Sequence, residues 1–315
     1  MSAVLSRVNK TLIRREFWEN RSLWIVPTVV IGLFLFTGIV RLVMMLTGHA
    51  YVGTNASGSD FNFNGPDLGN AEPSELAALI RVSPLFIAVP FNGIMLIVVF
   101  FYLLDSLYAD RRDRSVLFWR SMPVSDVRTV LVKLATGIFA ATAITFAAVI
   151  VTQLLTILLG LVSGGMVEHP GLLLTHPLAM LEGWCLLAYA LIAQSIWFLP
   201  YYGWWMLASA WARRAPLLWA LLPPAMLIIM EGIVFQSAHF WHLISHHLLD
   251  WLGLIFNFDP IKTGESGREL MMNGDFLNPD GLARFLSSPE MWTGLLLGAA
   301  FIYGAIWLRR NRSEI

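Results

Sequence analysis

The sequence predicts an all-α integral membrane protein with six transmembrane helices, and both its composition and its apolar runs support this fold class. Of the 315 residues, 57% are hydrophobic and only 13% are charged, and the mean hydropathy is +0.66. Soluble domains carry about 25% charged residues. A spanning helix needs about 20 apolar residues, because each residue rises about 1.5 Å through a hydrocarbon core about 30 Å thick.

Six stretches are long enough to span, and each must be helical because the hydrocarbon offers its backbone no water to bond. The fourth stretch contains Pro200, where it is expected to kink or end, and the fifth contains Pro223 and Pro224. Together the six are expected to form a single transmembrane domain over residues 1–315. The predicted spans are 23–46, 84–107, 134–162, 181–210, 216–235 and 291–308.

Positive charge is distributed unevenly between the two sides of these spans. The side with the N-terminus, the loops after the second and fourth spans, and the C-terminus holds 16 of the 21 Lys and Arg residues. All seven His residues fall elsewhere. Loops rich in Lys and Arg face the cytoplasm, so both termini are expected there. The formal net charge of +0 hides this asymmetry and carries no information about nucleic acid; no nucleic-acid partner is expected.

Three segments outside the spans have recognisable patterns. Residues 1–22 mix apolar and basic positions, which is typical of an interfacial helix, although a solvated basic tail is the alternative. Ser74 is a suitable N-cap for a short helix over residues 75–81. Residues 236–290 form an extracytoplasmic segment that begins with an aromatic and aliphatic run. That run predicts a helix against the outer membrane surface, followed by a polar, glycine-rich stretch with turns near Pro279 and Gly281.

The loop between the second and third spans, residues 109–126, combines many charges with apolar residues. Pro123 ends a first short helix, and Ser125 is positioned to cap a second one with Asp126 in its first turn. The second helix leads directly into the third span. A cytoplasmic partner that binds here could therefore push on the membrane helices. The alternative is an ordinary basic cytoplasmic loop.

This loop resembles that of the ABC type-2 permease family, the membrane subunits of many bacterial ATP-binding-cassette exporters. After the second span the family has an acidic, a basic and a small hydroxyl residue, then an apolar helix and a hydrophobic-Pro-hydrophobic-Ser turn. Here Asp110 stands where Glu is commoner, Arg111 follows it, and Arg114 stands where Gly often precedes the hydroxyl. The hydroxyl residue is Ser115, and the turn is Met122-Pro123-Val124-Ser125.

The resemblance implies that Arg111–Met122 form a cytoplasmic coupling helix seated in a groove of a separate ABC ATPase subunit. That subunit would bind ATP and Mg, because this chain lacks the GxxxxGK[ST] phosphate loop. We therefore expect a transport subunit of the bacterial inner membrane, with no enzymatic activity, catalytic residue or cofactor of its own. The expected ATPase-docking residues are Asp110, Arg111, Arg112, Ser115, Phe118, Trp119, Met122 and Pro123.

The resemblance also implies a dimer with a second permease subunit, of the same or a different sequence. The excess of apolar and aromatic residues over charges in the spans favours a hydrophobic or amphipathic substrate. Two other functions remain open. One is a membrane scaffold or sensor that recruits a cytoplasmic protein, and the other is a metal-dependent membrane enzyme that uses the outer-face histidines.

Arg41 and Glu231 lie within the first and fifth spans at similar depth, where an ionised group is costly unless paired or facing water. We expect them to pair or to line the export path. The alternative is that Arg41 extends to the membrane surface and Glu231 lies beyond the hydrocarbon edge.

Four further patterns carry weaker signals. His239, His242 and His246 would share one helix face and are candidate metal ligands, although no cysteine or suitably spaced carboxylate accompanies them. The single Cys185 excludes an intrachain disulfide. Gly294-x-x-x-Gly298 would permit close helix packing. The fourth-span aromatics are expected to form an interfacial belt or, alternatively, a wall of the substrate path: Trp197, Phe198, Tyr201, Tyr202, Trp204 and Trp205.

Overall fold

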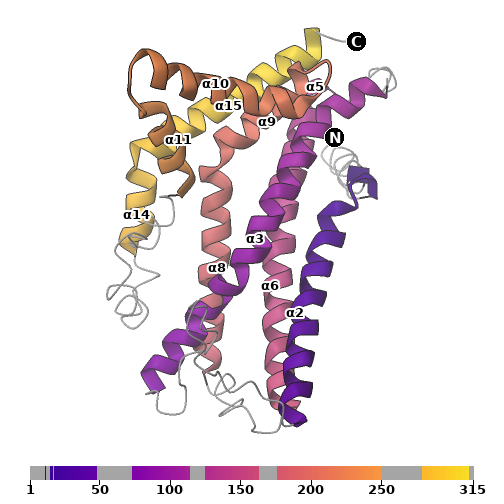
Figure 1. The fold of residues 1–315 in the computed structure, drawn as a ribbon, viewed down its shortest axis with the longest axis vertical. Helices are drawn as coiled ribbons and strands as arrows, with labels where there is room; N and C mark the ends of the chain where they lie inside the picture. Colours follow the sequence, from indigo (N-terminus) through magenta and orange to yellow (C-terminus); the bar gives the residue numbers. More distant parts are fainter. Residues whose placement is uncertain are drawn as a thin grey trace, which may run out of the picture.

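The computed structural model describes residues 11, 15–16, 18–47, 73–113, 125–162, 176–249 and 279–311, and within these ranges every regular element is a helix (Figure 1). The helices are α2 (Ser22–Leu46), α3 (Pro73–Arg112), α5 (Asp126–Ala135), the π-helix η2 (Thr136–Ala140), α6 (Ala141–Val162), α8 (Pro177–Trp197), α9 (Leu199–Trp211), α10 (Pro216–Val234), α11 (His239–Leu249), α14 (Pro279–Ser287) and α15 (Pro289–Asn311).

Six helical stretches are long and apolar enough to cross a membrane, and each coincides with one predicted span, so the prediction of six membrane-spanning helices is confirmed at that level. The third stretch runs continuously from α5 through η2 into α6, as the sequence predicted. The six stretches are Ser22–Met44, Ala77–Arg112, Asp126–Leu159, Pro177–Trp197, Pro216–Val234 and Pro289–Asn311.

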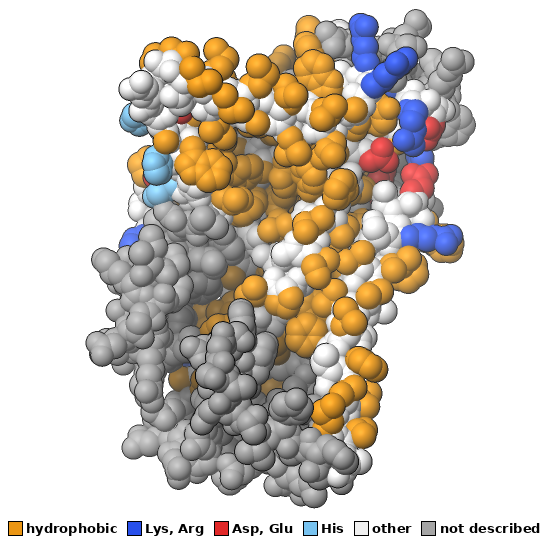
Figure 2. Space-filling view, in the orientation of Figure 1, with side chains coloured by type: hydrophobic (Ala, Val, Ile, Leu, Met, Phe, Trp, Pro, Cys, Tyr) orange, Lys and Arg blue, Asp and Glu red, His pale blue; other side chains and the backbone are white. Residues whose placement is uncertain are grey.

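The helices form two groups. Helices α2, α3, α6 and α8 run along the long axis of the molecule, whereas α9, α10 and α15 cross it near one end (Figure 1). The most extensive contact between two helices joins α9 to α15, and α3 packs on both α8 and α9. The start of α2 and the end of α15 lie at that same end. Of α10 only Ala220 is buried, so apolar side chains cover this part of the surface (Figure 2).

Helix α3 is longer than predicted, because the short helix expected at residues 75–81 is continuous with the second span. Pro84 lacks the N–H that would bond the carbonyl of Ile80, four residues earlier. The Ser83 hydroxyl donates to that carbonyl instead, at 2.9 Å. A side-chain donor beside the proline thus lets the helix pass through it.

The fourth span divides at Phe198, whose backbone angles leave the helical region between α8 and α9. Pro200 lies in the first turn of α9, where its missing N–H is tolerated. The sequence therefore placed this break correctly. It did not predict α14, in which Pro279 begins the helix and Gly281 lies within its first turn. Phe285 of α14 is buried and packs near Trp197.

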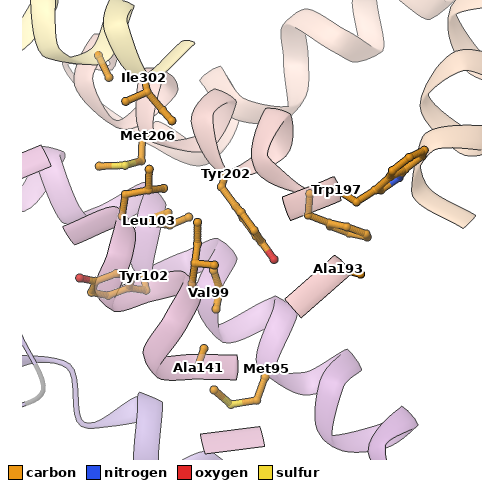
Figure 3. Packing of buried hydrophobic residues seen from close by; sticks show 14 of the residues in the cluster. Met95, Val99, Tyr102, Leu103, Ala141, Ala193, Trp197, Tyr202, Met206 and Ile302 are labelled. Atoms are coloured by element: carbon orange, nitrogen blue, oxygen red, sulfur yellow. The ribbon is translucent and has the colours of Figure 1, made fainter. Parts of the chain in front are cut away.

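The main hydrophobic core lies where α3, α8, α9 and α15 meet (Figure 3). Trp197, Phe198 and Tyr202 are buried in it, with exposed fractions of 1%, 3% and 4%. These aromatic side chains therefore belong to the core of the chain, and the interfacial belt predicted for them is wrong at these three positions. Their ring contacts with one another and with Trp205 explain why so many aromatics occur together.

The contact between α9 and α15 depends on two glycines that bring the helix backbones together. A Cβ atom on Gly298 would lie 2.9 Å from the Leu199 carbonyl carbon, and one on Gly203 would lie 2.7 Å from the Gly298 carbonyl oxygen. Both distances are shorter than van der Waals contact. The Gly294-x-x-x-Gly298 pattern thus lies at a close helix contact, as its sequence suggested.

We expect Gly298→Ala to destabilise the protein by about 1–3 kcal/mol, because the added methyl group overpacks this contact. Gly93→Ala in α3 is the matched control, since a Cβ atom there meets nothing within 4 Å, and it should be neutral or slightly stabilising. Thermal unfolding of the detergent-solubilised protein measures both. Equal melting temperatures for the two variants would contradict the close packing of α9 on α15.

Candidate functional site

A cluster of buried charges lies at the end of the molecule where α3 ends and α5 begins. Asp110, in the last turn of α3, is only 6% exposed. Its carboxylate accepts a hydrogen bond from Arg309 Nη1 of α15 at 2.8 Å and lies 3.4 Å from Lys133 Nζ of α5. Figure 2 shows charged side chains gathered at this end.

Arg309 binds a second carboxylate, and this contact gives the cluster its geometry. Its Nε donates to Asp126 Oδ1 at 3.2 Å, and Asp126 is the first residue of α5. Asp110 precedes the 114–124 segment and Asp126 follows it. One guanidinium, itself 5% exposed, therefore joins the two ends of that segment and ties both to α15.

The start of α5 is fixed in addition by its own cap. The Ser125 side chain accepts a hydrogen bond from the Arg128 N–H, and Asp126 occupies the positive N-terminal end of the helix. This confirms the capping predicted from the sequence. The position of Asp126 is thus set by the helix start as well as by Arg309.

The cluster also holds the chain before α2. Glu16 is 5% exposed; its carboxylate lies 3.3 Å from Lys133 Nζ and accepts a hydrogen bond from the Tyr102 hydroxyl at 2.9 Å. Lys133 Nζ donates to the Ser106 carbonyl at 3.0 Å. Three carboxylates and two cations thus share one site, in which Asp126 is partly exposed and the other four are buried. We call Glu16, Asp110, Asp126, Lys133 and Arg309 the buried charge cluster.

Arg111 links the end of α3 to the end of α9. Its guanidinium donates to the carbonyls of Ser209 and Ala212, the latter at 3.0 Å. In return, the Ser209 hydroxyl accepts from the backbone N–H groups of Leu107 and Tyr108 at 3.1 and 3.0 Å. Helix α9 is therefore attached to the same turn of α3 that carries Asp110.

The residues predicted to dock an ATPase fall into three groups. The side chains of Asp110 and Arg111 are engaged within the chain. Arg112 is exposed, lies against Asp113 at 3.0 Å, and faces the Tyr108 ring at 5.7 Å. The remaining predicted docking residues lie outside the described residues: Ser115, Phe118, Trp119, Met122 and Pro123.

Sequence reasoning missed Glu16, Lys133 and Arg309 as members of one site. Lys133 lies between Val132 and Leu134, and a charge among apolar neighbours was a signal for burial; Arg309 is followed by Arg310 and Asn311 and gave no such signal. Both were instead counted with the other basic residues of the cytoplasmic side. Their shared partner Asp110 is distant from each of them in the sequence.

Glu231, predicted to pair with Arg41, interacts with the beginning of α11. Its carboxylate accepts from the backbone N–H groups of His239 and Phe240, each at 2.7 Å, and from the Ser237 hydroxyl. It caps the first turn of that helix and connects it to α10. The side chain of Arg41 lies outside the described residues, so the Arg41–Glu231 pairing stays a prediction.

The three candidate metal-binding histidines of α11 have different surroundings. His239 Nδ1 lies 3.4 Å from Glu231, and His246 Nδ1 lies 3.7 Å from Glu290 of α15, while His242 is exposed. Among the described residues, no group of three or more His, Cys, Asp or Glu side chains is arranged to hold a metal ion.

His247, which sequence reasoning did not single out, attaches α11 to the break between α8 and α9. Its ring stacks on Trp197 with centroids 4.4 Å apart, and its Nε2 lies 3.0 Å from the Trp197 carbonyl oxygen. Trp197 Nε1 donates to the His247 carbonyl, and the Tyr201 hydroxyl donates to the Ile244 carbonyl at 3.0 Å. Burial lowers the pKa of His247, although the Trp197 carbonyl and Glu290 oppose that shift.

Comparison with known proteins returns no matching family model, curated protein or solved structure. The six apolar helices define the chain as a multi-pass α-helical membrane protein.

We expect Asp110→Ala to lower the free energy of unfolding by about 3–5 kcal/mol, because it leaves Arg309 and Lys133 buried with too little negative charge. Asp113→Ala is the matched control. Asp113 is exposed and pairs with Arg112 at the surface, so its loss should cost less than about 1 kcal/mol. Thermal unfolding followed by tryptophan fluorescence reports both. Equal losses would show that the cluster does not stabilise the fold.

Acid should loosen α11 from the α8–α9 break. When α11 is released from Trp197, the pKa of His247 returns to its ordinary value, so the released helix binds more protons than the attached one. The attachment of α11 therefore weakens as the pH falls below about 6.5. Amide hydrogen exchange of residues 239–249, corrected for intrinsic rates, should rise between about pH 7.5 and about pH 5.5. His247→Phe keeps an aromatic ring on Trp197 and should abolish this rise, whereas His242→Phe should retain it.

Proposed function

We propose that this chain is the permease subunit of an ATP-driven ABC exporter, which couples ATP hydrolysis in a separate ATPase subunit to substrate export. The sequence of residues 109–126 supports this proposal through its resemblance to the ABC type-2 permeases. The six apolar helices are consistent with the topology of that family. The proposed location is the bacterial inner membrane, with both termini in the cytoplasm.

The observation that carries the proposal is the bridge from Arg309 to both Asp110 and Asp126. A docking segment transmits force only if its two ends move with the membrane helices. Here both ends are bound to one buried guanidinium of α15, and the second end continues without interruption into the third predicted span. A displacement of residues 114–124 would therefore reach α3, the α5–α6 helix and α15 together.

Within this proposal, Asp110 and Arg111 position the coupling segment and do not contact the ATPase. A side chain as buried as Asp110 has no surface to offer while its ion pairs are intact. The contacts with the partner are assigned to Arg112, which is exposed, and, by the resemblance to the ABC type-2 permeases, to Phe118, Trp119 and Met122.

The proposed transport cycle depends on thermodynamic linkage between the nucleotide state of the ATPase and the way it binds the coupling segment. ATP binding and hydrolysis act on the permease only if the coupling segment is bound differently in the two nucleotide states. Movement of the segment would then shift the helices attached to the buried charge cluster and reshape a path between two permease subunits. The excess of apolar and aromatic residues over charges in the spans favours a hydrophobic or amphipathic substrate.

Trp119→Asp should reduce several-fold the amount of ABC ATPase that co-purifies with the chain, because a charge cannot be buried in an apolar groove. Arg213→Glu is the control, since Arg213 is exposed between α9 and α10, on the side proposed to be cytoplasmic, and its change should leave association intact. Capture of a partner without an ATP-binding cassette would favour the scaffold or sensor function instead.

Labelling tests the orientation separately. Cys185 is the only cysteine, so Cys185→Ser with Trp119→Cys gives a chain with one reactive position. A membrane-impermeant thiol reagent should label it only after the cytoplasmic face is opened. Labelling in intact cells would contradict the proposed function.

A further inference from the structure

The turn between α9 and α10 presents two adjacent arginines at the end of the molecule that carries the buried charge cluster. Arg213 and Arg214 are both exposed. Neither has a hydrogen bond or an ion pair to any residue that the structure describes, and the first turn of α10 contains no acidic residue. Two neighbouring guanidinium groups without a carboxylate repel each other, so they favour an anionic partner from outside the chain.

The backbone of this turn is fixed on both sides of the arginines. Before them, Ala212 is fully buried, and its carbonyl accepts a hydrogen bond from Arg111 of α3 at 3.0 Å. After them, Ala215 has a φ of 50°, in the left-handed region that a residue with a Cβ atom adopts only at a cost. Pro216 then begins α10. The two arginines are therefore held outside the helices in a defined position.

A pair of tryptophans lies beside the turn, one on each helix. Trp211 ends α9 and Trp219 lies on α10, and their rings meet edge to face with centroids 6.2 Å apart. Both are about half-exposed, at 41% and 46%. Trp204 Nε1 donates to the Ala220 carbonyl at 2.8 Å and holds α10 against α9. Exposed tryptophans next to arginines are the composition expected at the level of the lipid headgroups.

The first turns of α10 add an apolar surface next to the arginines, and Figure 2 shows Lys and Arg side chains beside apolar surface at this end of the molecule. A phospholipid has the two matching parts, a phosphate for the arginines and acyl chains for the apolar side chains. A free inorganic anion would use only the arginines. The exposed leucines of this surface are Leu217, Leu218, Leu221 and Leu222.

We propose that Arg213 and Arg214 bind the phosphate of an anionic phospholipid, whose acyl chains lie along Trp219 and the exposed leucines of α10. Arginine suits this role because its planar guanidinium forms paired hydrogen bonds to phosphate oxygens. An anionic lipid is favoured over a zwitterionic one, whose ammonium group offsets the charge of its phosphate. This inference does not depend on the proposed function, because lipid binding at the turn requires no ATPase.

Native mass spectrometry of the detergent-solubilised full chain tests this site. Phosphatidylglycerol and phosphatidylcholine with identical acyl chains are added at equal concentrations, and phosphatidylglycerol should bind more tightly. Arg213→Gln combined with Arg214→Gln should lower the phosphatidylglycerol affinity about 5- to 25-fold, because one basic residue near an anionic lipid contributes a factor of about 5. Phosphatidylcholine affinity should change much less. Equal binding of the two lipids to the unaltered chain would overturn the proposal.

Arg128→Gln combined with Arg310→Gln is the charge-matched control. It removes two positive charges from α5 and α15 at the same end of the molecule and should leave the preference for phosphatidylglycerol intact. An equal loss in this control would show that overall charge, and not the turn, attracts the lipid. Excess inorganic phosphate should not displace bound phosphatidylglycerol. Displacement would show that the arginines take a free anion, which would also overturn the proposal.

Discussion

The guanidinium of Arg309, held between Asp110 and Asp126, is the interaction on which the arrangement of this end of the molecule depends. A buried cation is tolerated only with close anionic partners, and here the two partners lie on different helices. Because both carboxylates must contact the Arg309 guanidinium, α3, α5 and α15 are fixed relative to one another. Lys133 extends the same requirement to Glu16, so the chain before α2 is included as well.

Local sequence patterns predicted the elements well because their causes are local. Apolar length identified the six spans, Ser125 and Asp126 identified the start of α5, and Pro200 identified the break in the fourth span. The continuity of α3 through Pro84 was missed because it depends on a single Ser83 hydroxyl. The buried charge cluster was missed because Asp110 and Arg309 are separated by 199 positions in the sequence, and a pattern along the chain carries no information about such a pair.

The second helix group is held by close packing and by hydrogen bonds to backbone carbonyls. Gly203 and Gly298 let α9 and α15 meet at backbone distance, and Arg111 binds the carbonyls at the end of α9. At the end of α8, just before α9 begins, Trp197 contacts His247 of α11 and Phe285 of α14. The break between α8 and α9 is thus supported on both sides, which explains how an interrupted helix keeps a defined direction. Aromatic residues predicted to face a membrane surface instead provide this support.

The wide turn η2 has a consequence for the angular alignment of the helix that contains it. A π-turn accommodates one extra residue, and each residue of an α-helix advances the helical angle by about 100°. Side chains before and after the turn therefore project in directions that a regular α-helix would not combine. Before it, Lys133 projects toward Asp110 and Glu16, and after it, Thr142 projects toward Ser195. Shortening η2 by a single residue would restore regular winding but rotate one set of side chains away from its partners. The irregular turn thus allows one continuous rod to face two unrelated sets of neighbours.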